Sequence, residues 1–233
     1  MILAGLAIAA PPVAPRLSTV VAAAPLGAAV AEHLEALRAG AADEAGFDKN
    51  KQAMAQHANA IVALAQVLGN HDEASLYQAG AVELMAAAAT LSRAKDYAAA
   101  KAAFAAMEAA VAKTEGAAKP KWERAARLGL LMEEVQSLNN DLRRKLKRLE
   151  RNKESGARDA AVLAAFGQTL PYDTHEVKDE ADLPKWYALS HEFRDAAAEL
   201  SRHFASADAA AAEKSLARVE KSCAACHDVF HQE

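Results

Sequence analysis

The sequence predicts an all-α protein built from two tandem, alanine-rich four-helix bundles. Of its 233 residues 52% are hydrophobic but only 5% are aromatic, and alanine supplies much of the apolar content. Alanine has the highest helix propensity, whereas strands favour aromatic and β-branched residues. No segment alternates apolar and polar residues over a useful length, as a half-buried strand would. A helical fold class follows from these observations.

Residues 1–25 form an apolar, small-residue-rich segment before the first expected helix, and the first acidic residue of the chain is Glu32. Such a segment is typical of a secretory signal region, although no Lys or Arg precedes its apolar run. A disordered Ala/Pro-rich leader is the alternative. Pro11, Pro12 and Pro15 interrupt the first apolar stretch, so we expect no membrane-spanning helix there and no stable membrane span after the leader is removed.

Helix-start and helix-stop residues divide the rest of the chain. Asp72 and Asp96 are expected N-caps, and Pro120 and Pro184 suit first helical turns. We expect a polar, acidic loop over 171–183. The expected helices cover residues 26–39, 47–68, 73–94, 97–115, 121–152, 157–170, 185–205 and 208–230.

Short matches suggest that the chain contains an internal repeat. The tripeptide at 66–68 resembles that at 168–170, and Leu-Ser-Arg at 91–93 recurs at 200–202. A weaker match joins 106–108 to 218–220, which are 112 residues apart. The matches keep their order along the chain, which favours duplication. We therefore predict a helical bundle over 26–119 that lacks a cofactor motif and a second bundle over 120–233.

The C-terminal sequence contains a cofactor-attachment motif. Cys223, Cys226 and His227 form Cys-x-x-Cys-His, the attachment signature of c-type haem. Positions i, i+3 and i+4 share one face of a helix, so both thiols can add to vinyl groups of one porphyrin while the histidine binds its iron. The sequence predicts one covalent haem c, with Cys223 and Cys226 as its attachment residues. Leu216, Val219, Cys223, Cys226 and Phe230 are expected to share the buried face of this helix.

The first half lacks this motif. At the 112-residue offset, Val111, Thr114 and Glu115 stand where the second half has its two cysteines and histidine. Two other readings of the motif are weaker. A zinc site could use Cys223, Cys226 and His231, but the customary second pair of ligands is missing. A thioredoxin-type dithiol would require a strand before the motif.

A bundle whose last helix ends in Cys-x-x-Cys-His-x-x-Phe resembles the class II c-type cytochromes, the cytochrome c′ and c556 group. The resemblance covers about residues 121–233 and is specific at Cys223, Cys226, His227 and Phe230. It implies a cytochrome c′-like haem bundle, matured outside the cytoplasm, with His227 as the proximal iron ligand. In six-coordinate members a Met from the first bundle helix also binds iron, and Met132 is the candidate here. Filling an irregular gap between helices is its alternative role.

These features favour an exported monohaem cytochrome, periplasmic or otherwise extracytoplasmic, that transfers electrons between redox partner proteins and is not an enzyme. A five-coordinate protein of the cytochrome c′ type that binds NO or CO is the first alternative. A non-haem helical module that binds a partner protein is the second. The net charge of −4 argues against nucleic acid as a partner. Apolar stripes on such bundles favour homodimers. The basic run at 143–148 is expected to be a solvated face, with steering of an acidic redox partner as the alternative.

Overall fold

The computed structural model describes residues 10–116 and 118–231, and every regular element within them is a helix. The fold class predicted from composition is therefore confirmed. The α-helices are α1 (Ala23–Gly40), α2 (Glu44–Asn70), α3 (Ala81–Leu91), α4 (Tyr97–Val111), α5 (Leu128–Leu146), α6 (Leu149–Thr169), α7 (Leu183–Ala205) and α8 (Ala209–Phe230). Short 3-10 turns, η1 (Leu17–Thr19), η2 (Leu170–Tyr172) and η3 (Glu180–Asp182), complete the set.

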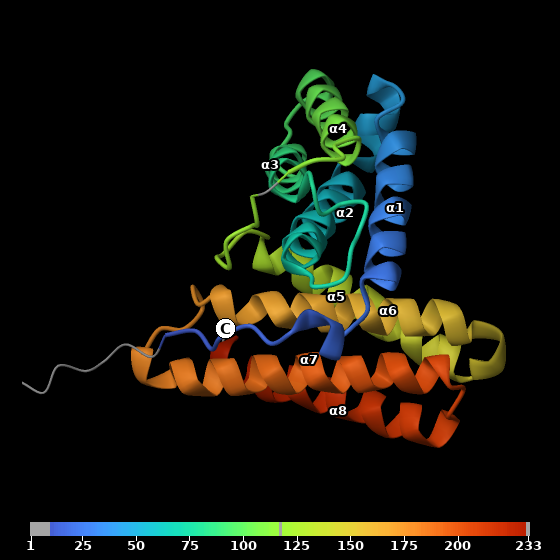
Figure 1. Ribbon diagram of the computed structural model, residues 1–233, viewed down its shortest axis with the longest axis vertical. Coiled ribbons are helices and arrows are strands. Elements are labelled where there is room, and N and C mark those ends of the chain that lie inside the picture. Colours follow the sequence, from blue (N-terminus) through green and yellow to red (C-terminus); the bar gives the residue numbers. More distant parts are fainter. Residues whose placement is uncertain (1–9, 117, 232–233) are drawn as a thin grey trace, which may run out of the picture.

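The helices form two groups of four in chain order. In Figure 1, α1 to α4 form the upper group, and α6, α7 and α8 run across the lower part of the molecule. Successive helices pack against each other within each group, and α1 and α2 also pack against α6. Buried residues of both groups belong to one continuous hydrophobic cluster. The two bundles therefore share a core.

Two helices that the expected repeat would make equivalent, α4 and α8, begin with the same kind of cap. Asp96 precedes α4 and accepts a hydrogen bond from the amide of Ala99. Asp208, which is 112 residues later, precedes α8 and accepts one from Ala211. Each carboxylate satisfies an amide that has no partner inside its helix. The last helix of each bundle thus begins in the same way at the offset that the sequence suggested.

The first helix of each bundle repeats as well. Arg38 of α1 pairs with Glu108 of α4, and Arg143 of α5 pairs with Glu220 of α8. The arginines are 105 residues apart and the glutamates 112. The same 105-residue offset relates two stripes of buried residues: Leu26, Val30 and Leu37 on α1, and Leu131, Val135 and Leu142 on α5.

The expected helix over 73–94 is wrong in its first part, because α3 begins only at Ala81. Asp72 is not its N-cap. Its carboxylate accepts hydrogen bonds from the backbone amide and hydroxyl of Ser18 and from the guanidinium of Arg16. With its carboxylate committed to a distant segment, Asp72 cannot start a helix, and residues 72–80 form a loop.

The expected helix over 121–152 is also wrong. Residues 118–127 form an extended linker, and the helical part is broken between α5 and α6. Buried side-chain amides of α2 hold the linker: Asn59 exchanges two hydrogen bonds with the backbone of Arg127, and Gln66 donates to the carbonyls of Lys121 and Glu123. These backbone groups are satisfied by α2, so they need no helix of their own.

Residues 10–22 belong to the segment expected to be a leader, of which residues 1–9 lie outside the described part of the chain. Leu17 and Val21 are buried in the shared core. The carbonyl of Val21 accepts a hydrogen bond from Nε2 of His71 at 2.9 Å, and the carbonyl of Pro12 accepts one from the hydroxyl of Tyr172. This segment, which we call the N-terminal strap (residues 10–22), thus joins the two halves.

In the described residues, none of the helices has the length and apolarity needed to cross a lipid bilayer.

Candidate functional site

The cysteine motif lies in the last two turns of α8, near the C-terminal end marked in Figure 1. The predicted apolar face of this helix is confirmed: Leu216 and Val219 are buried, and Cys223, Cys226 and Phe230 are half-buried. Both thiols therefore lie on the side of α8 that packs against the bundle. They are free, with no disulfide between them.

The two cysteines lie at a division in the buried core. Cys223 packs against the main cluster, whereas Cys226 and Phe230 pack against a small second cluster made of Leu183, Trp186 and Tyr187. Trp186 and Phe230 meet edge to face with ring centroids 5.1 Å apart. Leu128, at the start of α5, contacts both clusters. The thiols therefore border the junction of α5, α7 and α8.

Burial raises the pKa of both thiols, Cys223 and Cys226, to about 11. The neighbouring Cys226 and Glu220 add smaller upward contributions at Cys223. Both groups are thus protonated near neutral pH. A redox-active Cys-x-x-Cys pair works through a thiol whose pKa is lowered to favour the thiolate. The direction of the shift here is the opposite, which disfavours the dithiol reading.

His227 follows Cys226 and is exposed. Its ring lies beside that of His231, with centroids 5.5 Å apart. Among residues 10–116 and 118–231, no three His, Cys, Asp or Glu side chains are arranged to hold a metal ion. The zinc reading therefore has no preformed ligand set in that part of the chain.

Met132, the candidate sixth ligand, lies on the second turn of α5. It is half-buried and packs against the same main cluster as Cys223. Helix α5 contacts α8, so Met132 and the cysteines belong to neighbouring helices of one bundle. Leu128 and Leu131 flank it, and a crevice of only about 10 Å³ lies beside them. The crevice has at most the volume of one water molecule.

The first bundle closes the equivalent region with protein. Met132 corresponds to Gly27 at the 105-residue offset. The ring of Tyr77, from the loop before α3, covers Gly27 so closely that an added Cβ would lie 3.5 Å from it. Tyr77 is buried. An aromatic side chain therefore fills the place in the first bundle where the second has its methionine.

The residues at this site fit a covalently attached haem by their chemistry. Two free thiols one helical turn apart border an apolar junction, and an imidazole follows at the next position. The surrounding side chains are apolar or aromatic, as a porphyrin requires of its neighbours. The thiols and the imidazole would hold the group, and the leucines of α5 with Trp186 would contact it.

The structure also brings together histidines that sequence reasoning left apart. His33 of α1 and His57 of α2 share a hydrogen bond between their Nδ1 atoms at 3.0 Å. Burial lowers the pKa of His33 to about 4 and lowers that of His57 as well. Their separation of 24 residues spans a helix–helix turn, so no local spacing could reveal the pair. His203 of α7 shares a hydrogen bond with the hydroxyl of Ser215 on α8.

No family model matches this chain, and neither the curated proteins nor the solved structures include a match.

Proposed function

We propose that this protein is an exported, monohaem c-type cytochrome that carries electrons between redox partner proteins. Cys223 and Cys226 would tether the haem, His227 would bind its iron, and Met132 would complete the coordination from α5. One observation carries the proposal: the only two cysteines of the chain lie on one face of α8, free and half-buried, directly before a histidine.

The chain's own residues account for attachment and enclosure. Each thiol adds across a vinyl double bond, so that sulfur bonds to one carbon and the thiol hydrogen passes to the other. No oxidant is needed, and the protonated state of both thiols suits this addition. Leu128, Trp186 and Phe230 exclude water from the junction. When bound, the haem supplies an iron that cycles between ferric and ferrous states.

A five-coordinate protein that binds NO or CO is the second candidate. The observation that favours it is the position of Leu128, which packs on both clusters beside the cysteines. An apolar side chain there would leave the iron face without a ligand. Met132 decides between the candidates, because a methionine thioether bound to the iron together with His227 would make it six-coordinate and raise its potential.

The test is expression of the full chain in a periplasm with c-type maturation, followed by visible spectra and a denaturing gel stained for haem. We expect a stained band and a reduced spectrum with sharp, split bands. Broad high-spin bands that shift under CO would instead support the gas-binding candidate. A colourless protein with no stained band would contradict both candidates.

A pair of methionine variants isolates the sixth ligand. Met132→Leu should convert a low-spin spectrum to a high-spin one while the haem stays attached. Met85→Leu is the matched control, because Met85 is also half-buried against the main cluster but lies on α3 of the first bundle. If both variants keep the wild-type spectrum, Met132 is not an iron ligand.

A further inference from the structure

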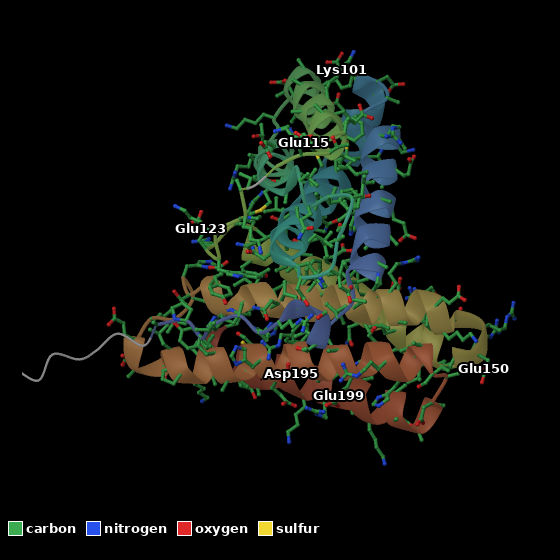
Figure 2. The ribbon with its side chains drawn as sticks, in the orientation of Figure 1. Lys101, Glu115, Glu123, Glu150, Asp195 and Glu199 are labelled. Atoms are coloured by element: carbon green, nitrogen blue, oxygen red, sulfur yellow. The ribbon has the colours of Figure 1, made fainter. Side chains whose placement is uncertain are left out.

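A second candidate site lies at the turn between α5 and α6, at the opposite end of the second bundle. An open depression of about 460 Å³ is lined by Arg144, Lys145, Arg148, Arg151 and Asn152. No acidic or apolar side chain lines it. Glu150, which Figure 2 labels at the right-hand end of the lower helices, marks this turn.

The depression is strongly positive on a protein that is acidic overall. Residues 141–154 contain seven Lys or Arg and three Asp or Glu, whereas the whole chain has a net charge of −4. Two of the lining cations are already paired, Arg144 with Asp141 and Lys145 with Asp159. Arg148 and Arg151 are exposed and have no ion pair within the described residues. Two guanidinium groups are thus free to bind an anion.

Backbone groups add to this positive field. The depression includes the first turn of α6, whose N-cap residue, Arg148, makes no side-chain capping hydrogen bond. The first amides of a helix have no partner inside it and form the positive end of its dipole. The side-chain amide of Asn152 does not face a bound anion, because its Nδ2 donates to the carbonyls of Lys145 and Arg148 and closes the turn.

The position of the depression separates it from the cysteine site. It joins the last turn of α5 to the first turn of α6, whereas Cys226 shares its cluster with Leu128 at the start of α5. The 19 residues of α5 span about 28 Å at 1.5 Å per residue. The depression and the second cluster beside Cys226 therefore lie at opposite ends of α5.

We propose that the α5–α6 turn binds a small anion carrying two or more phosphate groups. Guanidinium groups form paired, charge-assisted hydrogen bonds with phosphate oxygens, and arginine outnumbers lysine in the lining. Two unpaired arginines offer one guanidinium group to each of two phosphate groups. The volume lies in the range of small-molecule sites and exceeds what one orthophosphate fills. This proposal is independent of the haem.

Calorimetric titration of the full chain with inorganic pyrophosphate, at a constant ionic strength of about 0.1 M, tests it. We expect saturable one-to-one binding, with orthophosphate binding more weakly. The double variant Arg148→Gln/Arg151→Gln should weaken the affinity at least about tenfold, because each lost arginine removes charge-assisted hydrogen bonds. Lys153→Gln is the control. It removes one charge from the same turn outside the lining, and the affinity should stay within about twofold.

Three outcomes would overturn the proposal. One is the absence of saturable binding. Another is an equal loss of affinity in the double variant and in Lys153→Gln, which would show unspecific attraction. The third is binding to vesicles of anionic phospholipid without binding of free pyrophosphate, which would assign the turn to a membrane surface. Circular dichroism of each variant checks that the helices are intact.

Discussion

Ala207 is the one described residue other than glycine with a positive φ, 56°. It ends α7: its amide donates to the carbonyl of Phe204, and the next amide, of Asp208, donates to that of His203. This hydrogen-bond pattern is a Schellman motif, whose left-handed position favours glycine because a Cβ is strained there.

Ala207→Gly should therefore raise the free energy of unfolding by about 0.5–1 kcal/mol. Ala188→Gly is the control, because Ala188 is exposed within α7. There the same change should lower the free energy of unfolding by about 1 kcal/mol. Urea unfolding of the wild type and of both variants measures these changes in the free energy of unfolding. A loss of stability in Ala207→Gly would show that the left-handed conformation is not strained.

The His33–His57 pair predicts a pH-dependent stability. Burial lowers the pKa of folded His33 to about 4, whereas an unfolded histidine titrates near 6.5. Between these values the unfolded state binds more protons, so stability rises with pH and is lost as the pH falls from about 6.5 to about 4. The loss should reach about 3 kcal/mol at most.

His33→Gln should flatten this dependence. Urea unfolding of both proteins at pH 7 and at a pH just above that of acid unfolding gives the comparison. The same change with pH in wild type and variant would mean that other groups control the acid sensitivity.

Among the elements, α6 and α7 pack closely against each other where Gly167 faces Arg194. A Cβ on Gly167 would lie 2.8 Å from the Cα of Arg194 on α7, closer than non-bonded atoms allow. Backbone cannot move aside as a flexible side chain can. A substitution there must push the two helices apart.

Gly167→Ala should lower the free energy of unfolding by about 1–3 kcal/mol through overpacking. Gly129→Ala serves as the control, because nothing lies within 4 Å of its added Cβ and it is exposed on α5. There the gain in helix propensity should stabilise the protein by up to about 1 kcal/mol. Equal stability of Gly167→Ala and wild type would contradict the packing described here.

Element type was predictable from the sequence wherever a local signal decided it. Asp96 caps its helix as expected, and the apolar face of α7 is buried at Trp186, Phe193 and Phe204. The two wrong predictions, a helix starting after Asp72 and a helix covering the linker, have a common cause. Asp72 and the linker 118–127 are held by residues about fifty or more positions away, such as Ser18 and Asn59, and periodicity carries no information about such partners.

At the cysteine site too, local sequence predicts some features and tertiary contacts determine the others. The motif and its buried face were readable from spacing alone. The second cluster around Trp186 and Tyr187 and the contact of Leu128 with both clusters come from tertiary packing. The basic run at 143–148 was visible as a charge pattern, but its depression forms only when the first turn of α6 folds back to contribute Arg151 and Asn152.

At the scale of the whole molecule, the N-terminal strap connects the bundles. Asp72 anchors it through Arg16 and Ser18, and hydrogen bonding to Ser18, followed by that to Arg16, lowers the pKa of this carboxyl well below its usual range. A lowered pKa contributes stability above the unfolded value, near 3.9, and that contribution is lost as the pH falls further.

Asp72→Asn should therefore lower the melting temperature at pH 7, and its difference from wild type should narrow below about pH 4. Asp48→Asn is the control, since Asp48 is exposed on α2 and makes no ion pair within residues 10–116 and 118–231. A wild-type melting temperature for Asp72→Asn at pH 7 would show that the strap adds nothing to stability.

The central claim is that Cys223 and Cys226 hold one haem covalently. Intact-mass spectrometry of the periplasm-matured chain, with peptide mapping of α8, tests it most directly. The expected result is a mass increase of one haem that survives acid denaturation, maps to the peptide containing both cysteines, and is absent from Cys223→Ser/Cys226→Ser. An unmodified mass with two free thiols, under conditions that mature a known c-type cytochrome, would contradict the claim.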